Sequence, residues 1–373
     1  MERMTKHTPS DTEQIELNAI REEIDAIDAD IQTLIGRRAE CAQKVADIKT
    51  RGGQVEAVFY RPEREAQVLR AVKARNHSLI PNEDMARLFR EIMSVCLALE
   101  QPVKVAYLGP EGSYSHACVL KQFGTSVHPY AVPSIDAVFA AVEKKHVQYG
   151  VVPVENSSEG VVKQTQKALM DTALKVTGEV DLAIHHCLLA QNPDPHALKK
   201  IVAHPQALGQ CEQWLSQNLP GLVTEEVDSN AVAAQMAEAD PNVGAIASEE
   251  AARLYGLKIL ETRIEDQKNN TTKFWVLGQE AAGPSGQDKT AMILSVPNQA
   301  GSLIRVLDSF ARRRISMTRI ISVPSTETRW DYIFYIDILG HREQPEVAEA
   351  LTEVQAQCSY FKLLGSYPVS PLD

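Results

Sequence analysis

The chain has 373 residues, 44% hydrophobic and 23% charged, which accommodates roughly two or three domains with their own cores, and its net charge of −11 argues against a nucleic-acid partner. The six cysteines are scattered without a Cys-x-x-Cys pair, so the sequence indicates neither a disulfide framework nor a zinc site and favours reduced thiols in a cytoplasmic protein. The first residues lack the apolar core of a signal peptide and no stretch reaches the length of a membrane span, so we expect a soluble protein without a membrane partner.

The first hundred residues carry a helical pattern. From Leu17 onward, apolar residues recur at steps of three and four, which predicts one long helix from about Glu13 to Lys49. Such a helix is on the order of 55 Å long, too long for a small helical domain to cover by itself, so we expect a partner helix from a second chain. Pro62 suits the start of a second helix and Asn82 the start of a third.

Cations interrupt the apolar seam of the first predicted helix. Arg38 occupies a seam position, where a lone arginine can also snorkel outward or fix the register of a coiled coil. Lys49 lies eleven residues later, so both cations project from nearly the same face, roughly 16 Å apart. Arg21 lies on another face, roughly 25 Å before Arg38, so it cannot readily join the same pocket in its own chain, but an antiparallel partner chain could supply it.

Over residues 11–101 the three predicted helices resemble the all-helical chorismate mutase domain, which forms an intertwined dimer. The residues that carry this resemblance, in chain order, are Arg21, Arg38, Lys49, Arg64, Glu65 and Glu100, and Cys96 lies one turn before Glu100. The resemblance implies that Arg38 and the partner's Arg21 hold the carboxylates of chorismate. It further implies that Lys49 faces the ether oxygen and that Glu65 accepts a hydrogen bond from the ring hydroxyl.

The chemistry of this family suits those residue types. The rearrangement of chorismate to prephenate is unimolecular, so the protein needs no nucleophile and no cofactor, only a folded substrate and stabilised charge on the ether oxygen. Two positions depart from the best-known members, since Cys96 replaces a serine and Glu100 replaces a glutamine. We expect a protonated Glu100 to donate to the ether oxygen.

Strand and helix patterns alternate through the middle of the chain, which predicts an α/β domain with mostly parallel sheets. Polar motifs follow the predicted strands: GPEGSYS at 109–115, PVENSSEGVV at 153–162 and AHPQALGQC at 203–211, while NNTTKF at 269–274 opens a further strand. Ligands of open α/β sheets bind beyond the strand ends. Taken singly, each motif is also typical of an ordinary turn or helix start.

Together these motifs resemble the prephenate dehydratase family over residues 103–279, and the resemblance implies two lobes with a cleft between them, as in periplasmic binding proteins. It makes Thr272 the essential threonine, donating a hydrogen bond to the departing hydroxyl of prephenate, with Lys273 near a carboxylate. Lys273 stands where the family has arginine and so loses the bidentate fork, and Ala203 stands where relatives often have serine. The other residues that we expect to bind the substrate are Ser113, Glu155, Asn156, Ser157 and Gln210.

A stretch rich in glycine and small polar residues, 278–289, predicts a linker to a βαββαβ unit of the ferredoxin-like class. Over residues 289–370 this unit resembles the ACT domain of phenylalanine-inhibited dehydratases. The expected regulatory residues are Gly301, Ser302, Leu303, Ile321 and Ser322. Ile321 and Val323 replace the charged residues of the usual Glu-Ser-Arg-Pro, so we expect phenylalanine to inhibit, but at higher concentration than in members that keep those charges.

The order of the motifs makes the whole chain similar to the bifunctional chorismate mutase/prephenate dehydratase family. This similarity implies a homodimer or larger homo-oligomer that converts chorismate to phenylpyruvate without a cofactor or metal. Two alternatives stay open. The helical domain could only dimerise, or the protein could be a non-catalytic sensor that binds a ligand without turnover.

Overall fold

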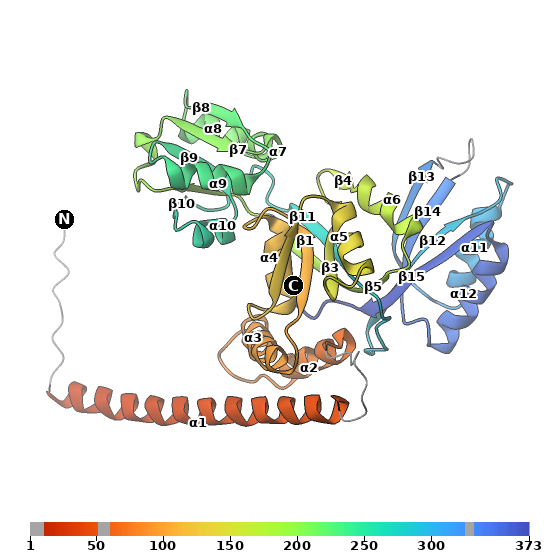
Figure 1. The fold of residues 1–373 in the computed structure, drawn as a ribbon, viewed down its shortest axis with the longest axis horizontal. Coiled ribbons are helices and arrows are strands. Elements are labelled where there is room, and N and C mark those ends of the chain that lie inside the picture. Colours follow the sequence, from red (N-terminus) through yellow and green to blue (C-terminus); the bar gives the residue numbers. More distant parts are fainter. Residues whose placement is uncertain (1–10, 51–59, 325–331, 373) are drawn as a thin grey trace. The chain divides into compact units, whose positions relative to one another are not determined.

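The computed structural model describes residues 11–50, 60–324 and 332–372. The chain divides into two compact units, Met1–Phe59 with Val95–Pro102 and Tyr60–Ser94 with Val103–Asp373, and each is described by itself (Figure 1).

The first unit is built on α1, a single helix of 40 residues from Asp11 to Thr50, so the predicted long helix is confirmed. Its apolar seam is uncovered in the single chain, because the seven large aliphatic side chains from Ile15 to Leu34 are 41% to 70% exposed. A seam of this length at heptad spacing is typical of a helix that packs against other helices.

The second unit begins with α2 (Pro62–Ala74) and most of α3 (Asn82–Glu100). Their apolar sides meet in a small cluster that includes Leu69, Ala86, Met93 and, from the end of the chain, Leu372. The C-terminal residues therefore help to hold these two helices in the second unit.

A first lobe follows, with the strand order β2-β1-β3-β11-β5 and β4 paired to β3. Its strands are β1 (Lys104–Leu108), β2 (His128–Val132), β3 (Tyr149–Asn156), β4 (Gly160–Val161), β5 (Lys175–Ala183) and β11 (Thr271–Gly278). Its helices are α4 (Tyr114–Phe123), α5 (Ile135–Glu143) and α6 (Lys163–Asp171).

The second lobe has the strand order β10-β6-β9-β7-β8. Its strands are β6 (Cys187–Ala190), β7 (Lys200–Ala203), β8 (Val223–Glu226), β9 (Val243–Ala247) and β10 (Lys258–Glu261). Its helices are the short 3₁₀ helix Pro195–Ala197, α7 (Pro205–Gln210), α8 (Glu212–Asn218), α9 (Asn230–Ala239) and α10 (Glu249–Leu254). The chain crosses between the lobes at residues 184–186 and returns at 262–270.

The expectation of mostly parallel sheets is wrong in both lobes. In the first, β1 is parallel to β2 and β3, but β11 runs antiparallel to β3 and β5. The physical reason is the double crossing: β5 leads toward the second lobe and β11 returns from it, so the two adjacent strands must run in opposite directions. In the second lobe, β6 is antiparallel to β9 and β10.

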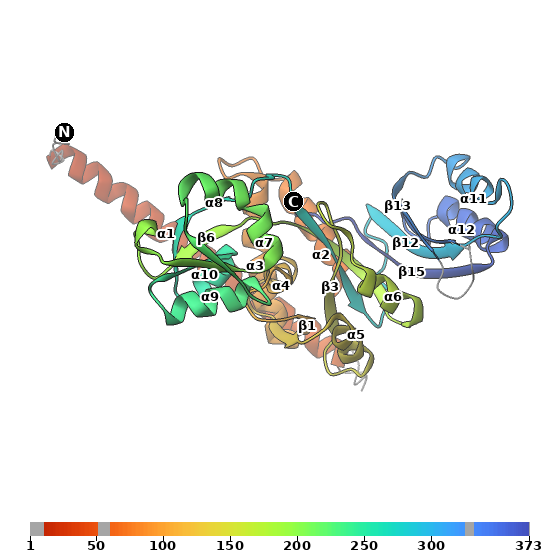
Figure 2. The ribbon, with the colours of Figure 1, turned by 90° about the horizontal axis from the view of Figure 1, so that it is seen from above.

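The C-terminal domain has the predicted βαββαβ order, with an antiparallel sheet in the order β13-β14-β12-β15. Its elements are β12 (Asp288–Ser295), α11 (Ser302–Ala311), β13 (Met317–Pro324), β14 (Tyr332–Leu339), α12 (Pro345–Gln357) and β15 (Tyr360–Pro368). Helices α11 and α12 lie together on one face of this sheet (Figures 1 and 2).

The other face of this sheet packs on the first lobe. Ile293, Tyr335 and Leu364 belong to the same buried cluster as Val176 and Trp275 of the first lobe. Strand β15 passes β5 so closely that a Cβ atom on Gly365 would lie 2.2 Å from the carbonyl oxygen of Val176. The C-terminal sheet and the first lobe thus share one core.

Candidate active site

A cavity of about 260 Å³ lies between the two lobes. It is lined by the turn between β1 and α4, the end of β3, both crossing segments, the start of β11, and the N-terminal ends of α7 and α9. Of the residues predicted from the sequence, the cavity brings together Ser113, Asn156, Gln210 and Thr272.

Thr272, 9% exposed, sits at the start of β11 opposite Asn156 in β3. The Asn156 side-chain amide donates from Nδ2 to Thr272 Oγ1 at 2.8 Å. Because the threonine oxygen accepts this bond, its own proton remains available, and the described residues supply no acceptor for it. The hydroxyl proton of Thr272 is therefore left without an acceptor among the described residues.

A chain of hydrogen bonds continues from Asn156 along the cavity wall. Asn156 Nδ2 also donates to Asn270 Oδ1 at 2.8 Å, and Asn270 Nδ2 donates to Gln210 Oε1 at 3.2 Å. His186 Nε2 lies 2.8 Å from the same Gln210 oxygen, and the Tyr114 hydroxyl lies 2.8 Å from His186 Nδ1. Burial lowers the pKa of His186, although the hydrogen bond with Gln210 opposes this.

Ser113 acts as a helix cap at the edge of the cavity. Its Oγ accepts from the backbone N–H of His116 and donates to the carbonyl of Leu108 at 3.2 Å, so both functions of the hydroxyl are occupied. The start of α4 and the start of α9, capped by Ser229, both face the cavity. In the described part of the chain the lining contains no lysine or arginine.

Three predicted substrate-binding residues lie outside this lining. Ser157 pairs with the backbone of Thr271, accepting from its N–H at 3.0 Å. Glu155 accepts a hydrogen bond from Arg319 Nε of β13 at 2.9 Å. Lys273 lies on the opposite side of β11 from its neighbour Thr272.

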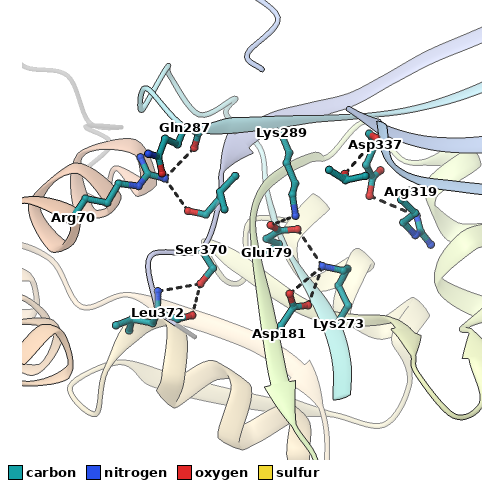
Figure 3. Close-up of polar contacts among 12 residues, drawn as sticks. Arg70, Glu179, Asp181, Lys273, Gln287, Lys289, Arg319, Asp337, Ser370 and Leu372 are labelled. Atoms are coloured by element: carbon teal, nitrogen blue, oxygen red, sulfur yellow. Dashed lines mark hydrogen bonds and ion pairs between the residues drawn. The ribbon is translucent and has the colours of Figure 1, made fainter. Parts of the chain in front are cut away.

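Lys273 belongs to a group of charges around the buried Glu179, between the first lobe and the C-terminal sheet (Figure 3). Its Nζ lies 2.9 Å from Asp181 and 3.3 Å from Glu179, and Lys289 of β12 reaches the other Glu179 oxygen at 2.5 Å. Burial alone would lower the pKa of Lys273, but the two carboxylates outweigh it and raise the pKa. The lysine that replaces the family arginine is thus held by protein carboxylates.

Helix α2 binds the segment between β11 and β12 through hydrogen bonds from Arg70. Arg70 of α2 donates to the carbonyls of Ser285, Gln287 and Val369 at 3.2, 2.9 and 2.8 Å. Figure 3 shows the contact of Arg70 with Gln287. The segment predicted as a linker is therefore fixed at this point by several hydrogen bonds.

In the first unit, Arg38 and Lys49 of α1 both act electrostatically on Glu100 of α3. Partial burial raises the pKa of Glu100, while Lys49 and Arg38 oppose this. Cys96, one turn before Glu100, is buried. Arg21 is exposed and donates to Asn18 on its own helix at 3.4 Å.

Arg64 and Glu65 belong to the second unit. The Glu65 carboxylate lies 3.1 Å from Nη1 of Arg90, a side chain that is 4% exposed. Burial raises the pKa of Glu65, and Arg90 opposes this. Arg64 is exposed on α2.

The predicted regulatory residues lie in two places on the C-terminal domain. Gly301, with φ of 81°, precedes α11 and leaves the first amides of the helix without a side-chain cap, next to Ser302 and Leu303. Ile321 and Val323 pack against the core that the C-terminal sheet shares with the first lobe, whereas Ser322 is exposed. Apolar residues at 321 and 323 therefore suit the apolar surface that they contact.

Sequence reasoning missed several polar residues of the cavity. Tyr114 and His204 line it and lie within the motifs at 109–115 and 203–211, but they were not chosen as site residues, whereas His186 and Asn230 stand in a crossing segment and a helix start without a motif. The one available signal was the His-His pair at 185–186, placed directly before the strand Cys187–Ala190.

Across the described residues, no helix is long and apolar enough to cross a membrane. The same residues contain no group of three histidine, cysteine or acidic side chains that could hold a metal ion.

Three family models match the chain in order. Chorismate mutase type II matches residues 20–101, prephenate dehydratase matches 105–282 and the ACT domain matches 290–355. A relative from Stutzerimonas stutzeri, the bifunctional chorismate mutase/prephenate dehydratase, is 44% identical, covering 97% of this chain and 100% of that protein.

Two solved structures resemble about 72% of the chain. A prephenate dehydratase from Arthrobacter aurescens in complex with L-Phe is 28% identical with a TM-score of 0.64, covering 72% of this chain and 90% of that one. A structure described as GqqA, a novel type of quorum quenching acylase, is 30% identical with a TM-score of 0.65, covering 72% of this chain and 98% of that one.

Proposed function

Because this chain belongs to the bifunctional chorismate mutase/prephenate dehydratase family, we propose that the cavity between the lobes binds prephenate and that Thr272 assists its dehydration. The observation that carries this assignment is the hydrogen bond from Asn156 to Thr272 Oγ1, which turns the threonine proton toward a bound molecule. The chain is a chorismate mutase and a prephenate dehydratase, and its ACT domain regulates phenylalanine biosynthesis.

The dehydration needs little help from the protein. The ring carboxylate of prephenate leaves as carbon dioxide, the electrons of the broken C–C bond enter the ring, and the C4–O bond breaks. The departing hydroxide takes up one proton, so the products are phenylpyruvate, carbon dioxide and water. Thr272 donates a hydrogen bond to the departing oxygen, and solvent supplies the net proton.

The substrate carboxylates are held by neutral groups. Lys273 lies outside the cavity lining, bound to Glu179 and Asp181, and the described lining carries no lysine or arginine. The starts of α4 and α9 present backbone amides and the positive ends of two helix dipoles to the cavity, and Gln210 adds a side-chain amide.

The mutase site combines Arg38, Lys49 and Glu100 with Arg21 from a second copy of the chain. The first three interact electrostatically within one unit, whereas Arg21 bonds only along its own helix among the contacts described. The uncovered apolar seam of α1 provides the surface for that second copy. Under this arrangement the smallest active form of the mutase is a homodimer.

Phenylalanine is the proposed effector of the ACT domain. The similar Arthrobacter aurescens dehydratase was solved in complex with L-Phe. The start of α11 after Gly301 has no side-chain cap. The N–H of Ser302 donates to the carbonyl of Gln299, and the amide of Leu303, which follows it, suits the effector's carboxylate.

One experiment tests the whole proposal. Chorismate is supplied to the purified full-length protein, and prephenate and phenylpyruvate are followed together. Sequential formation of both supports the proposal. Turnover of added prephenate without turnover of chorismate would show that the helices only dimerise, and binding without any turnover would indicate a sensor.

A further inference from the structure

We propose that His186 and Asn270 are positioning residues of the dehydratase site, which fix the direction of a hydrogen-bond chain so that Gln210 and Thr272 both present donors to the substrate. The inference rests on the proposed function, because it assigns roles around the same cavity. The inference is supported by the geometry of the hydrogen-bond chain, because backbone N–H groups fix the orientation of the side chain at one of its ends.

The anchored end is Asn156. Its side-chain oxygen accepts from the backbone N–H groups of Ser158 at 2.9 Å and Glu159 at 3.1 Å. A backbone N–H can only donate, so the orientation of the Asn156 amide is fixed with its oxygen toward this turn. The amide nitrogen must then face the cavity side.

That orientation propagates from one amide to the next. The two hydrogens of Asn156 Nδ2 go to Thr272 Oγ1 and Asn270 Oδ1, both at 2.8 Å. Since Asn270 uses its oxygen as the acceptor, its nitrogen faces Gln210 Oε1 at 3.2 Å. Each amide therefore has a single orientation that satisfies its neighbours.

His186 closes the chain. Its Nε2 lies 2.8 Å from Gln210 Oε1, which can only accept, so the ring must carry a proton on Nε2. The ring is 2% exposed, and burial lowers its pKa, so it is neutral and Nδ1 is an acceptor. The Tyr114 hydroxyl lies 2.8 Å from Nδ1 and 2.8 Å from the carbonyl oxygen of His185, so its single proton is shared between these two acceptors. The backbone N–H of His186 is itself held by Glu265 at 2.9 Å.

The consequence appears at the two ends that face the cavity. Gln210 Nε2 is buried and has no partner among the described residues, so both of its hydrogens are available to a ligand. Thr272 keeps its hydroxyl proton in the same way. A departing hydroxyl and a carboxylate both accept hydrogen bonds, so the two donors match groups of prephenate.

A matched pair of variants tests His186. The amide of glutamine can place an N–H near the position of Nε2, whereas the shorter asparagine reaches only the position of Nδ1. His186→Gln should therefore keep the donor to Gln210 and retain most dehydratase activity. His186→Asn loses that donor, and we expect kcat/KM for prephenate to fall by about 10- to 100-fold. If His186 only fills space, the presence of a donor at this position does not matter, and the two variants should have similar dehydratase kcat/KM values.

Mutase activity and thermal stability of both variants are measured beside the dehydratase rate, and mutase activity should match wild type. Equal losses in both variants with intact mutase activity, or wild-type rates in both, would overturn the proposal. A wild-type enzyme without dehydratase activity would instead refute the proposed function.

The ring tautomer gives a readout independent of activity. In ¹⁵N-histidine spectra of the wild-type protein, His186 should show a protonated Nε2 and an unprotonated Nδ1. The resonance is assigned by its loss in either variant or, if both are insoluble, by its shift in Tyr114→Phe. A proton on Nδ1 alone would leave Nε2 without a hydrogen to donate to Gln210 Oε1, and it would contradict the assignment.

Discussion

Arg319 of the ACT sheet donates from Nε to Glu155 Oε2 at 2.9 Å, and Glu155 is the residue directly before Asn156 of the dehydratase cavity. The arginine side chain is 7% exposed, and its guanidinium carbon lies 5.4 Å from the centre of the Trp275 ring. Lys289 of β12 in the ACT sheet and Lys273 of β11 in the first lobe both bind the carboxylate of Glu179 (Figure 3). Residues beside both Asn156 and Thr272 are thus bound, directly or through Glu179, by the regulatory domain.

We expect Arg319→Met to weaken feedback inhibition while leaving the basal dehydratase rate within a few-fold of wild type. The change removes the link to Glu155 but keeps apolar volume beside Trp275. Coupling energies between sites are typically about 1–3 kcal/mol, so the phenylalanine concentration for half inhibition should rise by roughly 5- to 150-fold. Inhibition curves of the full-length protein measure this directly.

Arg312→Met is the matched control, because Arg312 pairs with Asp308 and Glu353 within the ACT domain. It should respond to phenylalanine like wild type. An unchanged inhibition curve for Arg319→Met would show that the effector acts by another route.

Replacing the hydroxyl of Thr272 separates the two activities. Thr272→Ala removes the donor to the departing hydroxyl, and we expect dehydratase turnover to fall by roughly 10²- to 10⁴-fold. Thr272→Ser keeps a hydroxyl within reach of Asn156 and should retain much more activity. Both variants should have wild-type mutase rates. Near-normal phenylpyruvate formation by Thr272→Ala would exclude this role.

Local patterns predicted the elements of this fold well, and long-range pairing was harder. The heptad seam predicted α1 almost to its ends, and the βαββαβ order of the last domain followed from its alternating pattern. The direction of β11 was mispredicted, because nothing within Thr271–Gly278 records that the chain has returned from another lobe.

The cavity shows the same limit. Thr272 and Asn156 stood out because they lie in motifs, whereas His186 is assigned only by the contacts that folding creates. Lys273 illustrates the converse: its motif suggested a ligand contact, but its partners, Glu179 and Asp181, lie about ninety residues away in sequence. A sequence motif shows which residue types are present, but the residues on the neighbouring strands determine which contacts those side chains make.

The mutase rate should depend on the protonation of Glu100. Burial raises the pKa of this carboxyl, with Lys49 and Arg38 opposing, and only the protonated acid can donate to the ether oxygen of chorismate. The mutase kcat/KM should therefore fall as pH rises through this pKa. Glu100→Gln should flatten the pH profile, while the dehydratase profile of the same variant stays unchanged. An unaltered mutase profile would remove Glu100 from the site.

Asp337 gives a pH prediction for stability. It is 2% exposed, and burial raises its pKa to about 6, although Arg319 opposes this. Because the folded protein holds this proton more tightly than the unfolded chain, the stabilising contribution is full below pH of about 4 and is lost as pH rises through about 6.

We therefore expect Asp337→Asn to increase the free energy of unfolding at pH 7 by on the order of 2 to 3 kcal/mol, with the gain vanishing near pH 4. Urea denaturation of wild type and variant across this range measures it. A variant less stable than wild type at pH 7 would mean that the charged pair with Arg319 outweighs the cost of burial.

A shared mutase site predicts complementation between two inactive variants. Arg21→Ala and Arg38→Ala should each lack most mutase activity, because each removes one of the cations proposed to hold the substrate carboxylates. A mixed dimer contains one intact site out of two, and random reassembly of equal amounts makes about half of the dimers mixed, so the mixture should recover about a quarter of the wild-type activity. Verified heterodimers without activity would place both arginines in one chain's site.

The core that β12, β14 and β15 share with the first lobe makes the ACT domain part of the catalytic domain's folding unit. Ile293, Tyr335 and Leu364 fill the same interior as Val176 and Trp275, so heat or denaturant cannot open one side without exposing the other. A chain cut within residues 278–288 would leave an apolar surface on the dehydratase lobe. Proteolysis or truncation at that point should therefore produce aggregation, instead of an unregulated enzyme.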